Sequence, residues 1–332
     1  MLSLPQVTLI CVDCINHEAA LVAMRRCMQH CDFARAVLIA DRRPDGNWGV
    51  LEFAQIERIA SREAYSQFML RKVGDYVQTS HALIVQWDGY VVNPLAWSDD
   101  FLRYDYIGAK WWHKEGPNVG NGGFSLRSRK LFDALNSMDL SVSKENEDDV
   151  ICRFQRTRLE ALGVRFADEP TADRFAYERG YEPGANLPFG FHGFFNMWRM
   201  LSPAELRSLF GMLDARTIAY LETMELASNY MKAGAYEESV FVCLRALDVN
   251  PDLVPALKIL CNSAVRLNRS WLSLMALKEL SRIEPLNTEC CLALGDVYAM
   301  YQRPKDAIRQ YRKVLELHPG DKVALLKLRQ LG

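Results

Sequence analysis

The chain has 332 residues, a length that allows about two domains, and its 49% hydrophobic and 24% charged residues are those of an ordinary globular protein. The formal net charge of −1 argues against a general nucleic-acid partner and against an anionic membrane surface, because both require a surplus of Lys and Arg. No stretch approaches the ~20 apolar residues of a membrane span.

The N-terminal apolar run, residues 7–12, is too short for the hydrophobic region of a signal peptide and predicts a strand. The nine cysteines do not form paired C-x-x-C knuckles, which favours reduced thiols over disulfides or a zinc site. We therefore expect a cytoplasmic protein.

From residue 4 to about residue 209, strand and helix patterns alternate. Apolar runs predict strands at 7–12, 36–40 and 81–85 with a shorter one near 55–59, and helical spacing predicts helices at 17–30 and 61–78. This alternation predicts an α/β sandwich on a mostly parallel sheet. Ligands bind such sheets at the carboxyl ends of the strands, where Asp41 and Asp88 are expected.

A second region, residues 217–332, has an internal repeat. Pro251, Pro285 and Pro319 are spaced 34 residues apart, and small and aromatic residues recur in register with them, among them Ala227, Tyr230, Gly295 and Tyr311. A 34-residue period of this kind is typical of tetratricopeptide repeats, in which each unit is a helix–turn–helix. We expect three repeats and a terminal helix, forming an all-α solenoid that follows a domain at residues 1–210.

Two motifs in the first region suggest phosphate and metal chemistry. The strand 81–85 leads into Gln86-Trp-Asp88, and a single carboxylate at a strand end suits Mg²⁺ or Mn²⁺ shared with substrate phosphates. The run Gly120-Asn-Gly-Gly123 lets backbone amides approach a ligand closely.

Two further motifs supply ionisable side chains. An acidic cluster (Glu145, Glu147, Asp148, Asp149) precedes an apolar helix, which is a suitable place for a general base. The stretch Pro188-Phe-Gly-Phe-His-Gly193 places His192 between glycines and aromatic residues.

Taken singly, each motif has a plain structural explanation. An Asp after a strand is usually a turn residue or a helix cap, a glycine cluster is often a tight turn, and acidic residues commonly stabilise a helix N-terminus. A histidine among aromatic residues is more often half-buried than a metal ligand. The order and spacing of the four motifs carry the functional argument.

That order resembles the A-type glycosyltransferases, the nucleotide-diphospho-sugar transferases. Gln86-Trp-Asp88 is similar to their D-x-D metal motif, with Gln86 in place of the first aspartate. The glycine run is similar to their acceptor loop, Asp148-Asp149 to the x-E-D segment of the catalytic base, and His192 to the late metal-binding histidine.

More narrowly, several stretches resemble an uncharacterised bacterial glycosyltransferase-like family over about residues 5–205. These stretches are Tyr104-Asp-Tyr-Ile-Gly-Ala109, Gly120-Asn-Gly-Gly-Phe-Ser-Leu-Arg-Ser-Arg129, Glu147-Asp-Asp-Val150 and the His192 motif.

The resemblance implies a metal-assisted, inverting transfer of a sugar from a nucleotide-sugar donor, UDP-sugar above all, to a hydroxyl group of a protein or glycan acceptor. Asp88 and His192 would hold Mn²⁺ or Mg²⁺, and Asp149, or its neighbour Asp148, would be the general base. The other expected contacts fall into two groups: the donor would meet Asp41, Arg71, Lys72, Gln86 and Asp88, and the acceptor Trp111, Trp112, Asn121, Gly122 and Gly123. Core packing is an equally good explanation for the two tryptophans, and a solvated helix face is the better one for Arg71 and Lys72.

The repeats would recruit a protein acceptor or partner, or else stabilise the catalytic domain or a dimer. Two other classes of function stay open: a catalytically degenerate scaffold that works through its repeats, which the Gln86 replacement favours, and a metal-dependent nucleotidyl- or phosphotransferase. A dinucleotide enzyme is disfavoured, because the first strand leads into Val12-Asp-Cys-Ile-Asn16 and lacks a glycine-rich turn.

Overall fold

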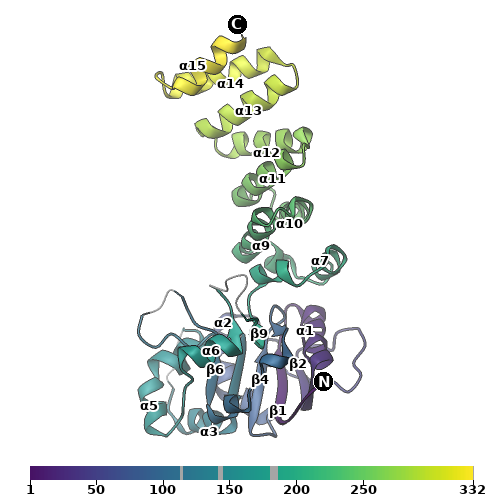
Figure 1. The fold of residues 1–332 in the computed structure, drawn as a ribbon, viewed down its shortest axis with the longest axis vertical. Helices are drawn as coiled ribbons and strands as arrows, with labels where there is room; N and C mark the ends of the chain where they lie inside the picture. The colour runs from purple at the N-terminus through teal and green to yellow at the C-terminus, as the bar shows by residue number, and fades with distance from the viewer. Residues whose placement is uncertain (113–114, 141–144, 180–185, 332) are drawn as a thin grey trace. The chain divides into compact units, whose positions relative to one another are not determined.

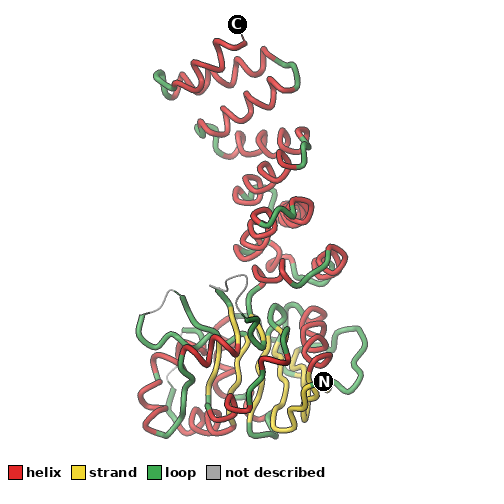
Figure 2. Tube along the Cα trace, viewed as in Figure 1, coloured by secondary structure: helices red, strands yellow, loops and turns green. Residues whose placement is uncertain are grey.

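The computed structural model describes residues 1–112, 115–140, 145–179 and 186–331 (Figure 1). The chain divides into two compact units, Met1–Met197 with Gly211–Asp214, and Trp198–Phe210 with Ala215–Gly332. Figure 2 shows strands in the first unit, whereas the described part of the second contains helices and loops. An α/β region followed by a helical region is therefore confirmed.

The first unit is built on a six-stranded sheet of order β3-β2-β1-β4-β7-β6. The strands β1, β2, β3 and β4 are parallel to one another, β7 is antiparallel to β4, and β6 is antiparallel to β7. The bounds of the sheet strands are β1 Leu2–Val12, β2 Cys31–Ala40, β3 Glu52–Gln55, β4 His81–Val85, β6 Tyr106–Gly108 and β7 Phe124–Ser128. The strand order reverses between β1 and β4, so the carboxyl ends of these two strands form the topological switch point at which open α/β sheets bind ligands.

The helices of this unit cover both faces of the sheet. Side chains such as Ile10, Val12 and Ile84 form one core with Met69 and Phe132 of the helices α2 and α3. The alternate residue Cys11 lies on the other face, close to Cys27 of α1. The helices are α1 His17–His30, α2 Arg62–Arg71, α3 Arg129–Ser137, α4 Glu147–Asp149, α5 Arg156–Ala161 and α6 Glu169–Phe175, with a π-helical turn at Val150–Phe154 and 3₁₀ turns at Val73–Tyr76, Pro94–Ala96, Asp99–Arg103 and Phe194–Arg199.

A small second sheet of order β5-β9-β8 lies in the same unit. The strand β5 (Tyr90–Val91) is antiparallel to β9 (Gly190–Phe191), and β8 (Ala176–Tyr177) is parallel to β9. Tyr90 pairs with Phe191, so Asp88 before β5 and His192 after β9 come from the same end of this ladder. The small sheet therefore brings two distant motifs together.

The second unit contains α7 Pro203–Phe210, α8 Ala215–Ile218, α9 Leu221–Lys232, α10 Tyr236–Val249, α11 Val254–Arg266, α12 Ser270–Ile283, α13 Thr288–Met300, α14 Pro304–Leu317 and α15 Lys322–Leu331. Successive second helices, α10, α12 and α14, begin 34 residues apart, and each is followed at two residues by one of the three periodic prolines. Gly295 shows why small residues recur, because a Cβ there would lie 2.3 Å from the Tyr311 ring. The helix spacing confirms the tetratricopeptide repeats.

Residues 198–210, which we expected in the first domain, cluster with the helices of the second unit. There the Phe210 ring of α7 packs edge-on against Phe241 of α10, with 5.4 Å between ring centroids. Within the described part of the chain, no helix has the length and apolarity that crossing a membrane requires.

Candidate functional site

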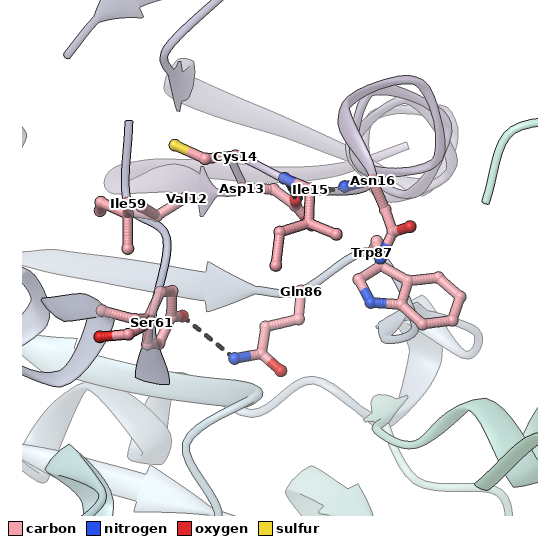
Figure 3. Close-up of a pocket in the computed structure, with 10 residues that line it drawn as sticks. Val12, Asp13, Cys14, Ile15, Asn16, Ile59, Ser61, Gln86 and Trp87 are labelled. Carbon is pink, nitrogen blue, oxygen red and sulfur yellow. Dashed lines mark hydrogen bonds between the residues drawn. The ribbon is translucent and has the colours of Figure 1, made fainter. Parts of the chain in front are cut away.

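A pocket of ≈170 Å³ opens at the topological switch point between β1 and β4 (Figure 3). Its walls come from the end of β1, the loop before α2 with the first turn of that helix, and the end of β4. The lining residues are Val12, Asp13, Cys14, Ile15, Asn16, Ile59, Ser61, Tyr65, Gln86 and Trp87. The prediction of polar side chains at this sheet edge did not include Asp13, Asn16 or Tyr65.

Asp13 organises the loop that connects β1 to α1. Its Oδ1 accepts hydrogen bonds from the backbone N–H groups of Ile15 and Asn16, both at 2.7 Å. Burial raises the pKa of Asp13 above its usual value, although these two hydrogen bonds act in the opposite direction. A carboxylate thus performs the turn-forming role that glycines perform in dinucleotide-binding loops.

Asp41, the predicted donor contact, lies at the end of β2, next to Cys14 of the pocket wall. Its carboxylate is 2.6 Å from His17 Nε2, and Arg58 Nε lies 3.9 Å from the other oxygen. Burial opposes ionisation, but the His17 hydrogen bond and backbone contacts hold the pKa of Asp41 below its usual value. Asp41 therefore contacts Cys14 of the β1–α1 loop and His17 at the start of α1, and it is not among the residues that line the pocket.

Gln86 connects the pocket to the second half of the site. Its Nε2 donates to the Tyr65 hydroxyl at 3.0 Å, along the dashed line that begins at Gln86 in Figure 3, and its Oε1 lies 3.1 Å from His192 Nε2. Its backbone N–H donates to the Gly123 carbonyl at 2.9 Å, which fixes the glycine run against the end of β4.

Asp88 and His192 form a nearly buried pair beside Gln86. Asp88 Oδ2 accepts from the Phe194 N–H at 3.0 Å, and Oδ1 lies 3.4 Å from His192 Nε2. On the other side of the ring, His192 Nδ1 is 3.3 Å from Glu178 Oε1. Burial alone would lower the pKa of His192, but Asp88 and then Glu178 raise it well above its usual value. The two carboxylates therefore favour the protonated form of the ring that lies between them.

The donors around this pair fit a divalent cation only as a partial site. Among the described residues, no three His, Cys, Asp or Glu side chains are grouped so that they could hold a metal ion. Asp88 and His192 supply two donors and the Gln86 amide oxygen a third, and Glu178 on the far ring nitrogen resembles the carboxylate that commonly orients a ligating histidine. A set of this kind suits Mg²⁺ or Mn²⁺ when substrate phosphates complete the coordination.

The two aspartates of the acidic motif differ sharply. Asp148 Oδ2 accepts from the Gly122 N–H at 3.1 Å, and burial together with Glu147 and Asp149 raises its pKa to about 7. Asp149 instead has Arg153 Nε 3.9 Å from its Oδ1. A π-helical turn, a rare element that is frequent at functional sites, begins directly after them at Val150.

The glycine run packs against side chains on every side. A Cβ at Gly123 would lie 2.0 Å from His192 Nε2, and one at Gly122 would lie 2.7 Å from Glu147 Oε1. Asn121 Oδ1 accepts from the Gly123 N–H at 3.1 Å and so holds the turn. These glycines are required because His192 and Glu147 lie directly over the backbone.

Four of the predicted contact residues lie outside the cluster or point to different roles. Arg71 donates to the Leu135 and Met138 carbonyls at 2.7 and 3.0 Å, where it satisfies the C-terminal end of α3. Arg71 and Lys72 line a second cavity of ≈590 Å³, which runs along α2 from Ala64 and shares Ile59 with the switch-point pocket. Arg71 itself lies ten residues after Ser61, about 15 Å along the helix at 1.5 Å per residue. Trp111 is buried against Gly120, whereas Trp112 is 68% exposed.

We predict that Asp88→Asn lowers the pKa of His192, because Asp88 makes the largest favourable contribution to the imidazolium. The pH titration of the His192 ring signals by NMR measures this. Since the folded pKa lies above the usual ~6.5, the stability that the pair contributes is complete below about pH 6.5 and is lost as the pH rises through the folded value. The stability difference between wild type and variant should therefore be largest near pH 6. The exposed Asp100→Asn is the matched control, and equal His192 titration in wild type and Asp88→Asn would contradict the assignment.

A family profile described as "Protein of unknown function (DUF5672)" matches residues 48–192. No curated protein matches the chain. Among solved structures the chain is similar to the MamA protein, with 18% identity, 38% of this chain and 69% of that chain covered, and a TM-score of 0.33. It is also similar to the first tetratricopeptide domain of human RPAP3 (20% identity, 36% and 91% covered, TM-score 0.31) and to that of Arabidopsis OM64 (17%, 35% and 93%, TM-score 0.30). The TM-scores are too low to carry an argument, so the repeat assignment depends on the helix spacing.

Proposed function

We propose that the first unit is an inverting glycosyltransferase of the A type, which moves a sugar from a nucleoside-diphosphate donor, in particular a UDP-sugar, to a hydroxyl group. The observation that carries the proposal is one continuous set of contacts. It runs from the switch-point pocket through Gln86 to the Asp88–His192 pair, and through the glycine run to Asp148.

The pocket suits one ring of the donor. A cavity of about 150 Å³ can enclose a benzene molecule, so ≈170 Å³ accommodates a nucleobase or a ribose and leaves the rest of the donor outside. Tyr65 and Trp87 offer aromatic surfaces, and Asp13 and Asn16 offer polar atoms. In this proposal Asp13, and not Asp41, is the carboxylate that the donor meets.

The diphosphate would lie outward of the pocket, toward Gln86. Asp88, His192 and the Gln86 amide oxygen would hold Mn²⁺ or Mg²⁺ there, with Glu178 orienting the imidazole. When bound, the cation would neutralise charge on the departing diphosphate as a Lewis acid. His192 must lose the Nε2 proton before it can serve as a ligand, so cation binding is expected to be stronger in alkaline solution.

Asp148 is the better candidate for the general base. A base is most effective when its pKa lies near the working pH, and the pKa of Asp148 is raised to about 7. The Gly122 N–H holds one carboxylate oxygen in a fixed direction. A carboxylate base acting opposite a departing diphosphate gives single displacement, and hence inversion.

A catalytically degenerate binding protein is the second candidate. Gln86 stands where the resemblance has an acidic metal ligand, and the described residues contain no group of three ionisable metal donors. In this alternative the repeats carry the function, and the first unit retains only the architecture of an enzyme.

We further propose that the repeats recruit a protein acceptor or partner. Support comes from apolar side chains that the first helices of the repeats leave in solvent, including Leu221 of α9, Val265 of α11 and Met300 of α13, which are 65%, 57% and 67% exposed. Solenoids characteristically use a surface built from successive repeats to bind partners.

Nucleotide sugars should raise the melting temperature of the protein. At a ligand concentration 100 times the Kd, binding stabilises the folded state by about 2.7 kcal/mol, which corresponds to roughly 5–10 °C for a unit of this size. Differential scanning fluorimetry with a panel of nucleotide sugars, with and without Mn²⁺, measures the shift. Asp88→Ala and His192→Ala should remove the Mn²⁺-dependent part, whereas the exposed Asp100→Ala should not. A panel that produces no shift under any condition would favour the binding-protein alternative.

Asp148→Asn should reduce sugar transfer by ~10²–10⁴-fold and leave donor binding intact, because the amide keeps the shape of the side chain but cannot accept a proton. The donor is the nucleotide sugar that gives the largest melting shift, and the exposed Asp100→Asn is the matched control, expected to remain at the wild-type rate. Since the base must be unprotonated, the wild-type rate should rise with pH through about 7 and then level off. Equal rates for Asp148→Asn and wild type would exclude Asp148 as the base.

Replacing Val265 and Met300 together by Glu should abolish labelling of acceptor proteins and leave hydrolysis of the donor unchanged, because the charges disrupt an apolar docking surface. The measurement is transfer of radiolabelled sugar to proteins of a cell extract, compared with donor hydrolysis in buffer. The matched control replaces Trp271 and Met275 by Glu. Both are exposed on α12, the second helix of its repeat. Undiminished labelling by the Val265/Met300 variant would show that the first unit reads the acceptor alone.

A further inference from the structure

Arg127 is a fully buried cation beneath the candidate site. It lies on β7 opposite Ala82 of β4, three residues below the carboxyl end of that strand, and its guanidinium lies 5.3 Å from the centre of the Tyr106 ring. Nε donates to Ser125 Oγ at 3.0 Å, and Nη2 donates to Glu147 Oε1 at 3.1 Å and to the Gly122 carbonyl at 3.3 Å. Within the described residues, Nη1 is buried and has no hydrogen-bond partner.

Stability alone is a poor explanation for this pair. Both Arg127 and Glu147 are withdrawn from water, with side-chain exposures of 0% and 7%, and the desolvation of two charges often exceeds the gain from their attraction. Well-packed apolar residues of similar volume would serve the core equally well or better. The contacts of the pair point instead to the edge of the sheet.

The Gly122 peptide transmits the position of Arg127 to Asp148. Arg127 holds the carbonyl oxygen of Gly122, while the N–H of the same residue donates to Asp148 Oδ2 at 3.1 Å. A side chain at position 122 would break this arrangement, because its Cβ would lie 3.0 Å from Arg127 Nη2 and 3.1 Å from Asp148 Cβ. The cation, the glycine and the two carboxylates are therefore in mutual contact.

We propose that Arg127 is a positioning residue for Asp148: it neutralises the buried Glu147 beside the aspartate and fixes the Gly122 N–H that orients the Asp148 carboxylate. The catalytic role of this positioning rests on the proposed function, in which Asp148 accepts the proton of the acceptor hydroxyl. The effect of Arg127 on the protonation of Asp148 can be measured without any substrate.

The charges around Asp148 define the expectation. Burial is the largest cause that raises the pKa of Asp148. Glu147 and Asp149 on the same short helix raise this pKa further, and Arg127 lowers it. Cys152 on the π-helical turn and the Tyr106 hydroxyl on β6 also interact with it, and Arg153 lies next to Asp149. Of these groups, Arg127 is the cation that counteracts the two neighbouring carboxylates, so its removal should make Asp148 harder to ionise.

The test is a pH titration of the full-length protein with ¹³C-labelled aspartate carboxyl groups, in which the Asp148 signal is identified by its loss in Asp148→Asn. In Arg127→Met the proton of Asp148 should persist to a pH higher by about 1–3 units, the usual effect of removing a nearby opposite charge. Glu147→Gln should lower the titration midpoint of Asp148, and the double variant should return toward wild type. Arg103→Met, which removes an exposed cation, should leave the midpoint unchanged.

An Asp148 midpoint that does not respond to Arg127→Met or to Glu147→Gln would overturn the proposal. Should Arg127→Met fail to fold, Glu147→Gln alone decides, because it removes one charge and keeps the shape of the side chain. Failure of the proposed function has a different signature: the titration would respond as described, but no nucleotide sugar would be bound or transferred.

Discussion

The antiparallel pairing of β7 with β4 is the constraint on which the site depends. Because β7 runs against β4, its first residue pairs with the last residue of β4, and the glycine run before it lies beside Gln86. A parallel strand in this position would carry the same glycines to the opposite edge of the sheet. The same pairing places Arg127 opposite Ala82, three residues before the carboxyl end of β4, and its side chain reaches Glu147.

The sequence pattern predicted the elements well, because the buried strands are uninterrupted apolar runs and the repeat period is marked by prolines. It also predicted that Gln86, Asp88, Gly123 and His192 would belong to one site, and these residues are in contact. The placement of Arg71 and Lys72 at the donor was less successful, since a helix that returns antiparallel to the strands carries its last turn away from their carboxyl ends. Partners such as Tyr65, Arg127 and Glu178 escaped notice, because a contact across the fold leaves no periodic signal in the chain.

The glycine run shows how one pattern can have two physical origins. Three glycines in four residues predict a backbone that approaches a ligand. In the structure the space above Gly120 is filled by Trp111, above Gly122 by Glu147, and above Gly123 by His192. The glycines thus admit protein side chains that themselves carry the charge of the site, so their chemical contribution is indirect.

The amide at position 86 gives the site a direction that a carboxylate would not. A carboxylate would accept hydrogen bonds from both neighbours, whereas Gln86 donates to Tyr65 and presents its oxygen to His192. The Tyr65 side chain also lines the switch-point pocket, so the amide of Gln86 joins the pocket wall to the buried imidazole. A change of the pocket wall at Tyr65 would therefore reach the Asp88–His192 pair through a single side chain, whose two ends have opposite hydrogen-bonding roles.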